Sequence, residues 1–159
     1  ILANLAALKF VQNGDILVSC VDGFQGCATV GDRITGMAKN CGAAGFVTDG
    51  PMRDFEGVVK VGLPSWCTGL NPNSPFTKGP GTVGFCVHLG GRQVETGDMI
   101  VADRDGVVVV PFEQIDAVLE RLEEIKALEA ALDKEVEEGL KVPQATLDLL
   151  DSDQVAYFD

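Results

Sequence analysis

Short apolar runs that alternate with glycine-rich turns constrain the fold of the first seventy residues most strongly. Residues 13–21 (NGDILVSCV) contain a turn and then a strand, and residues 44–50 (AGFVTDG) contain a buried strand closed by a turn. Between them, residues 31–45 have an acidic residue, Asp32, near their start and glycines at their end, which is typical of a short helix. Residues 53–62 predict a weaker helix and residues 63–69 another strand. These units predict an α/β fold with a central apolar sheet and flanking helices.

The pattern changes after this region. Residues 70–81 carry three of the seven prolines and predict an irregular loop. Residues 82–111 contain three or four short strands, and the GVVVV run at 106–110 predicts a strand that is buried on both faces. Residues 112–139 predict one long C-terminal helix with a single apolar stripe. Because this helix has more apolar surface than a small domain can cover, we expect its far end to meet another subunit.

Composition and charge narrow the possible partners and the compartment. The chain has 159 residues, and its 24 acids against 12 bases give a net charge of −12. Such a charge repels nucleic acid and anionic membranes, so neither is expected as a partner. The five cysteines are odd in number and contain no Cys-x-x-Cys pair, so we expect buried thiols rather than a disulfide framework or a zinc site. With no apolar span of membrane length and no secretory signal, the sequence predicts a cytoplasmic protein.

Charged residues follow two of the predicted strands. Asp32 opens a helix directly after a glycine, and Arg53-Asp54 follows the run VTDGPM. If the two strands are neighbours, both charged positions lie at the same edge of the sheet. The unpaired N–H groups of Arg33 and Ile34 could then bind a carboxylate, with Arg53 beside them and the Asp54 oxygen available to magnesium. The residues alone leave open a turn with two solvated charges and, for Asp32, a helix cap.

The spacing of these charges resembles a known motif. Asp32, twenty intervening residues and then Arg53-Asp54 are similar to the Asp-x20-Arg-Asp motif of the class II pyruvate aldolases in the RraA-like family. The segments GDILV, AKNCGAAGFVTDGPMRD, GLPSW, KGPGTVG and GDMIVADRDGVVVVP follow the family in order, so the resemblance covers nearly the whole chain. The family includes 4-hydroxy-4-methyl-2-oxoglutarate and 4-carboxy-4-hydroxy-2-oxoadipate aldolases, regulators of ribonuclease E activity, and proteins formerly labelled as menaquinone methyltransferases.

The resemblance implies a fold and an assembly. It implies a swivelling β/β/α sandwich with a central sheet, flanking helices and a long C-terminal helix. It also implies a single RraA-like domain over residues 1–159, preceded by a further N-terminal segment, in a homotrimer or a hexamer.

The resemblance further implies a role for each residue of the motif. Asp54 would anchor Mg²⁺ or Mn²⁺, largely together with water, and Arg53 would bind the oxo-acid. Asp32 would order a water molecule that transfers the proton, while the amides of Arg33 and Ile34 would bind the pyruvate carboxylate. The family site also takes a glutamate from the C-terminal helix of the adjacent subunit; Glu129 matches it best, and the rivals are Glu123, Glu124 and Glu135.

These roles imply a metal-dependent aldolase that releases pyruvate from oxo-acids of the 4-hydroxy-4-methyl-2-oxoglutarate type. The same enolate forms when oxaloacetate loses carbon dioxide, so decarboxylase activity is expected as well. No lysine lies in an apolar run where it could form a Schiff base, which disfavours a lysine-dependent aldolase. The alternative is a non-catalytic regulator of ribonuclease E activity, although such regulators tend to lack an acid at the position of Asp32. A methyltransferase is disfavoured because no glycine-rich nucleotide loop is present.

Overall fold

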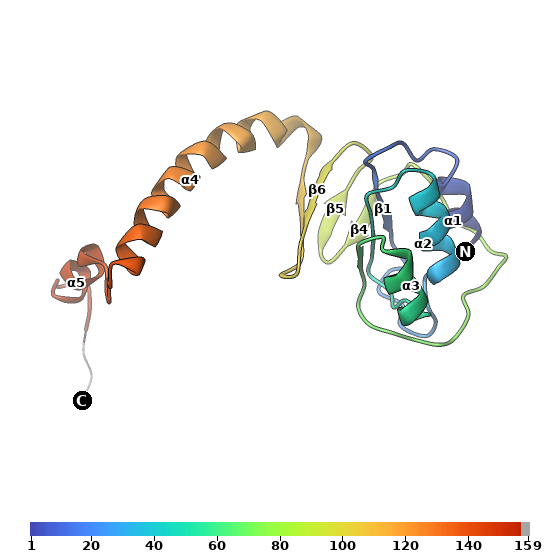
Figure 1. Ribbon diagram of the computed structural model, residues 1–159, viewed down its shortest axis with the longest axis horizontal. Helices are drawn as coiled ribbons and strands as arrows, with labels where there is room; N and C mark the ends of the chain where they lie inside the picture. Colours follow the sequence, from blue (N-terminus) through green and yellow to red (C-terminus); the bar gives the residue numbers. More distant parts are fainter. Residues whose placement is uncertain (157–159) are drawn as a thin grey trace. The chain divides into compact units, whose positions relative to one another are not determined.

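The computed structural model describes residues 1–156. Its internal contacts divide the chain into two units, and the boundary in the sequence lies between Gln114 and Ile115. The first unit contains, in chain order, α1 (Leu2–Ala7), β1 (Ile16–Ser19), α2 (Asp32–Asn40), β2 (Gly45–Thr48), α3 (Phe55–Val61), β3 (Ser65–Trp66), β4 (Val87–Leu89), β5 (Arg92–Val94), β6 (Met99–Ala102), β7 (Val107–Val110) and the 3₁₀ helix η1 (Phe112–Gln114). The second contains α4 (Ile115–Glu137) and α5 (Gln144–Leu150) (Figure 1). One domain over residues 1–159 stays a prediction.

A parallel sheet in the order β1-β2-β3 forms the centre of the first unit. β1 pairs with β2 from Ile16 opposite Gly45 onwards, and β2 pairs with β3 through Phe46 opposite Ser65. Parallel neighbours need a crossover connection, and α2 lies between β1 and β2 in the chain while α3 lies between β2 and β3. The predicted α/β class, with its sheet, flanking helices and long C-terminal helix, is confirmed.

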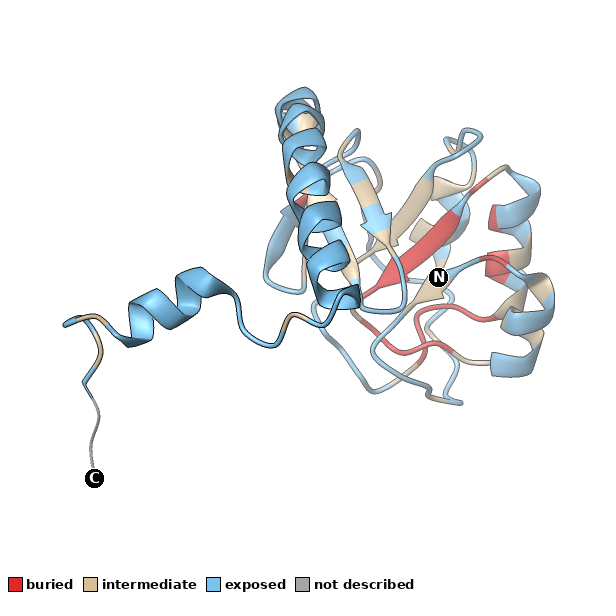
Figure 2. Cartoon of the chain, turned by 60° about the vertical axis from the view of Figure 1, so that its left-hand side comes forward, coloured by how far each residue is buried: buried red, intermediate tan, exposed pale blue. Residues whose placement is uncertain are grey.

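The hydrophobic core lies between this sheet and its helices. Ile34 and Ala38 of α2 pack in one cluster with Phe46 of β2 and with Met52 and Leu63. Figure 2 shows the buried residues concentrated in β2, in the inner face of α2 and in the segments beside them. The middle strand β2 is buried along its whole length, as expected of a parallel strand that has a neighbour on each side.

Two antiparallel hairpins complete the first unit. β4 pairs with β5 across Gly90 and Gly91, whose positive φ angles of 58° and 75° suit a tight hairpin turn. β6 pairs with β7, which confirms the predicted short strands. The prediction that the GVVVV strand is buried on both faces is wrong, since Val108 is 61% exposed. The physical reason is that β7 pairs only with β6, in a two-stranded sheet.

The second unit begins with the long helix that the apolar stripe predicted. α4 runs for 23 residues, and Gly139, with a φ of 102°, follows its end. No residue of α4 is buried, and Leu128 in the stripe is 68% exposed. The expected contact of this stripe with another subunit stays a prediction. Across residues 1–156, the helices are too short or too polar to cross a membrane.

The cysteines differ from the expectation that they are buried. Cys41, Cys67 and Cys86 are exposed, while Cys20 and Cys27 are half-buried. The expectation failed because all five lie in turns and loops rather than in helices or strands.

Asp49, just after β2, organises the loop that follows β1. Its carboxylate accepts hydrogen bonds from the backbone N–H of Val21 at 2.7 Å and of Gly23 at 2.8 Å, and its Oδ2 lies 3.3 Å from Cys20 Sγ. Burial raises the pKa of the Cys20 thiol, and the hydrogen bond and negative charge of Asp49 raise it further.

Cys20 is therefore expected to react slowly with iodoacetamide, because the thiolate is the reactive form. At mildly alkaline pH, peptide-resolved mass spectrometry should show slower labelling of Cys20 than of the exposed Cys67. Asp49→Asn should speed Cys20 labelling by up to about tenfold, which is the change that one pKa unit produces. Asp105→Asn, in an exposed turn, is the control; equal labelling of Cys20 in all three proteins would contradict the role of Asp49.

Candidate functional site

The parallel pairing of β1, β2 and β3 continues beyond the ends of the strands and brings two helix starts together. Val30 forms a parallel bridge with Met52, and Met52 forms another with Leu70, in the same order as the strands. The N–H of Arg53 donates to the carbonyl of Val30 at 3.1 Å, and the N–H of Thr29 donates to Pro51 at 2.7 Å. The residues that follow each bridge therefore share one edge, as predicted.

α2 presents free amide groups at this edge. Gly31 is its N-cap and supplies no side-chain cap, and Asp32 is its first residue. The first intrahelical bond runs from the N–H of Thr35 to the carbonyl of Gly31 at 3.2 Å. In the part of the chain that the structure describes, the N–H groups of Arg33 and Ile34 have no hydrogen-bond acceptor. These amides and the helix dipole favour an anion at this position.

α3 begins at the same edge with an unusual N-cap. Asp54 has φ 58° and ψ 44°, which is the left-handed region that few residues other than glycine adopt, and its carboxylate does not cap the helix. Its side chain is 44% exposed. The carboxylate therefore contributes nothing to helix capping, although aspartate is a good capping residue, and stays available to a ligand.

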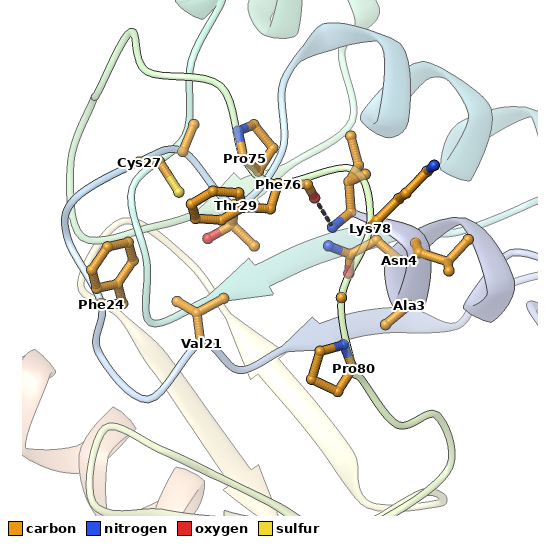
Figure 3. A pocket seen from close by; sticks show the side chains of 14 residues that line it. Ala3, Asn4, Val21, Phe24, Cys27, Thr29, Pro75, Phe76, Lys78 and Pro80 are labelled. Carbon is orange, nitrogen blue, oxygen red and sulfur yellow. Dashed lines mark hydrogen bonds between the residues drawn. The ribbon is translucent and has the colours of Figure 1, made fainter.

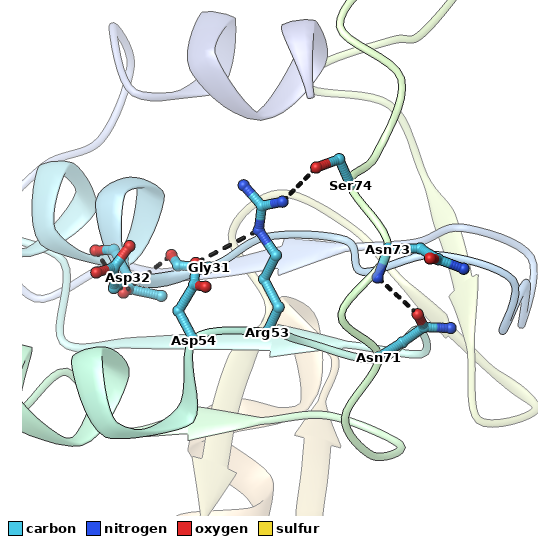
Figure 4. A network of polar contacts seen from close by, with 8 residues as sticks. Gly31, Asp32, Arg53, Asp54, Asn71, Asn73 and Ser74 are labelled. Atoms are coloured by element: carbon cyan, nitrogen blue, oxygen red, sulfur yellow. Dashed lines mark hydrogen bonds and ion pairs between the residues drawn. The ribbon is translucent and has the colours of Figure 1, made fainter.

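Arg53 lies between Asp54 and the loop at residues 70–81 (Figure 4). Its Nε lies 3.3 Å from Asp54 Oδ2, and its Nη1 donates a hydrogen bond to Ser74 Oγ. The Nε atom is itself buried but makes no well-aligned hydrogen bond. A half-exposed ion pair of this kind contributes little to stability. The contacts with Asp54 and Ser74 involve two of the five N–H donors of the guanidinium.

Asp54 could hold a divalent cation only in an open site and not in a closed cage. Nowhere in residues 1–156 do three or more His, Cys, Asp or Glu side chains gather as a ligand set. Mg²⁺ is commonly held by one or two carboxylates, with waters and substrate oxygens completing its octahedron. The half-exposed, uncapped carboxylate of Asp54 has the chemistry for this role.

The glutamates predicted for the site all lie in α4, in the second unit. Glu123 pairs with Lys126 at 3.4 Å, and Glu124 pairs with Arg121. The carboxylates of Glu129 and Glu135 have no ionic partner within residues 1–156. A place for Glu129 in the site therefore stays a prediction.

The sequence reasoning missed the contribution of the proline-rich loop. Besides the bond from Arg53 to Ser74, the N–H of Asn71 donates to the carbonyl of Met52 at 2.9 Å, and the N–H of Ala28 donates to the carbonyl of Asn73 at 3.0 Å. The position of the loop in the sequence was the signal that could have revealed this contribution. The loop begins at Leu70, which follows the third strand and bridges Met52, just as Met52 bridges Val30.

Two hollows lie in the first unit, and neither Asp32 nor Asp54 lines either of them. One, of about 490 Å³, is lined by Phe55, Val58 and Val59 of α3 and by residues of the segments on either side of that helix, Arg53 among them. The other, of about 450 Å³, is lined by Val21, Phe24, Thr29, Phe76 and Lys78 among others (Figure 3). The candidate site is therefore an open edge and not an enclosed pocket.

Comparison with known proteins identifies relatives of the chain. Residues 2–109 match the family model described as "RraA-like: Aldolase/RraA". A Halalkalibacterium halodurans protein named "Putative 4-hydroxy-4-methyl-2-oxoglutarate aldolase" is 33% identical over 148 residues, which cover 91% of this chain and 70% of the relative.

Solved structures agree with this result. An uncharacterized protein from Pseudomonas syringae pv. tomato superposes with a TM-score of 0.82 at 26% identity, over 93% of this chain and 70% of that one. Streptomyces coelicolor RraAS2, described as an unusual member of the RNase ES inhibitor RraA family, superposes with a TM-score of 0.68 at 36% identity, over 80% and 68% of the two chains.

The geometry of the ion pair predicts that it adds little to stability. Arg53→Met keeps the aliphatic stem and removes the charge, so it should change the free energy of unfolding in urea by less than about 1 kcal/mol. Lys60→Met on the exposed face of α3 is the matched control. A loss of about 3 kcal/mol or more for Arg53→Met alone would mean that the pair is a structural element.

Proposed function

The chain belongs to the RraA-like family, and we propose that it is a divalent-metal-dependent aldolase that releases pyruvate from oxo-acids of the 4-hydroxy-4-methyl-2-oxoglutarate type and also decarboxylates oxaloacetate. The observation that carries this proposal is the meeting of two helix starts, where Asp32 and the free amides of α2 lie beside Arg53-Asp54. The name of the Halalkalibacterium halodurans relative supports the reaction class.

We assign binding of the substrate's carboxylate to the start of α2. The unpaired N–H groups of Arg33 and Ile34 suit a carboxylate, and the partial positive charge of the helix start favours it. Arg53 has guanidinium donors left over after its contacts with Ser74 and Asp54, and these would bind the oxo-acid. Together, these groups orient the bond between C3 and C4 of the substrate for cleavage.

We assign proton transfer from the substrate hydroxyl to Asp32 and a water that it holds. Cleavage requires removal of the proton from the C4 hydroxyl, and a water held by the Asp32 carboxylate would accept it. A Mg²⁺ or Mn²⁺ ion at Asp54 supplies, when bound, positive charge that stabilises the developing enolate. Arg53 adds a second positive charge on the same side because it is adjacent to Asp54.

The proposal extends to the assembly. We assign Glu129 to the site of an adjacent subunit, in a homotrimer or hexamer whose contacts include the exposed stripe of α4. A cytoplasmic location belongs to the same proposal and rests on composition.

The second candidate function is a regulator that inhibits a ribonuclease by binding it. The likeness to Streptomyces coelicolor RraAS2 favours this candidate, and a net charge of −12 suits a basic protein partner. The presence of an acid at position 32 favours the enzyme, because a protein that acts only by binding needs no proton-transferring group there.

Pyruvate release tests the enzyme directly. With Mg²⁺ or Mn²⁺, the chain should form pyruvate from 4-hydroxy-4-methyl-2-oxoglutarate or oxaloacetate, and a chelator should abolish this activity. Asp32→Asn should lower kcat by about 10²–10⁴-fold with little change in KM, because it removes proton transfer and not binding. Asp54→Ala should remove the response to metal. A lactate dehydrogenase-coupled assay measures all of these.

Asp105→Asn, which changes an exposed turn carboxylate, controls for the loss of charge. If no 2-oxo-acid is turned over with any divalent metal, the enzyme assignment is wrong. Inhibition of a purified ribonuclease by the same inactive preparation would then favour the regulator.

Mixing two inactive variants tests the shared site. Arg53→Ala and Glu129→Ala remove groups that the proposal takes from different subunits, so mixed assemblies should regain part of the activity. Glu135→Ala mixed with Arg53→Ala serves as the comparison for the choice of glutamate. Mixed assemblies that form, as native mass spectrometry would show, but stay inactive would overturn the assignment of Glu129.

A further inference from the structure

Two glycines stand where the carboxylates of the candidate site come closest to the backbone. A Cβ atom on Gly31, the N-cap of α2, would lie 2.3 Å from Asp54 Oδ2 and 3.0 Å from Arg53 Cγ. A Cβ atom on Gly57, in the first turn of α3, would lie 2.6 Å from Asp32 Oδ2. Each carboxylate therefore occupies the space that a side chain at the opposite helix start would need.

The backbone does not explain either glycine. Gly31 has φ −143° and ψ −163°, an extended conformation that any residue adopts. Gly57 lies inside α3, where glycine is less favourable than alanine. Gly36 on α2 provides the contrast, because a Cβ atom there would meet only Val61 Cγ2 at an ordinary 3.7 Å. Space for the carboxylates, and not chain conformation, accounts for Gly31 and Gly57.

We propose that Gly31 and Gly57 are positioning residues, which set the Asp54 and Asp32 carboxylates in place by leaving out a Cβ atom. This inference rests on the proposed function for the roles of the two aspartates. Metal and proton-transfer sites depend on groups that hold their ligands within a narrow range of positions. In this chain, the missing Cβ atom leaves a space that the carboxylate itself fills, and neither carboxylate is held by capping a helix.

The two glycines differ in what a substitution would do. At Gly31, the closest atom is the end of the Asp54 side chain, which can rotate away. At Gly57, Asp32 Cβ lies only 2.8 Å away and cannot rotate, so the starts of α2 and α3 would have to separate. Gly31→Ala is therefore the cleaner test, because the chain should still fold while the Asp54 carboxylate moves.

Binding of Mn²⁺ to the full chain, measured by electron paramagnetic resonance, tests this inference without any assay of activity. Gly31→Ala should weaken Mn²⁺ binding about tenfold, as loss of a positioning group at a metal site does. Gly36→Ala, the same substitution on the same helix, should bind Mn²⁺ as the unchanged chain does. Asp54→Asn reports the loss of the ligand itself. If Asp54→Asn weakens binding and Gly31→Ala does not, the role of Gly31 is overturned while the proposed metal site stands.

Thermal unfolding provides a second test of the role of Gly31, and this test does not depend on the metal. Gly31→Ala should lower the melting temperature of the unchanged chain but lower it much less in an Asp54→Ala background, because the closest contact is then gone. Equal lowering in both backgrounds would overturn the positioning role. If Asp54→Asn leaves Mn²⁺ binding unchanged, the proposed metal site is wrong. The change in melting temperature in the two backgrounds then decides whether Gly31 positions Asp54.

Discussion

The parallel pairing of Val30 with Met52 is the contact on which the candidate site depends. It extends the order β1-β2-β3 past the strands, so α2 and α3 start at one edge. The buried strand β2 holds this pairing in register, because a shift of one residue would turn Phe46 out of the core. Without that register, Asp32 at the start of α2 and Arg53-Asp54 before α3 would not lie side by side.

Much of this arrangement could be predicted from local patterns. The alternation of apolar runs and glycines located β1, α2, β2 and α3, and the rule that parallel strands end at one edge brought the charged residues together. Contacts that depend on three-dimensional packing could not be predicted in this way. The bond from Arg53 to Ser74 requires the path of the proline-rich loop, which has no periodicity. The exposure of Val108 follows from its pairing with β6 alone, which an apolar run does not reveal.

Proteins similar to this chain carry two kinds of description, "Putative 4-hydroxy-4-methyl-2-oxoglutarate aldolase" and member of a ribonuclease-inhibitor family, and one fold can host several functions. In this chain, the left-handed backbone of Asp54, its uncapped carboxylate and the free amides of α2 lie together at one edge. Strained and unsatisfied groups gather where a ligand completes them. The proposal that substrate, metal and a neighbouring subunit complete this open edge is built on these features of the first unit.

The central claim is that metal and oxo-acid bind side by side at this edge. Crystals grown with Mn²⁺ and pyruvate, with data collected at the manganese absorption edge, test it most directly. We predict an anomalous peak at the Asp54 carboxylate and a pyruvate carboxylate on the N–H groups of Arg33 and Ile34. A manganese peak at other carboxylates, with none at Asp54, or a pyruvate that avoids the start of α2, would contradict the account.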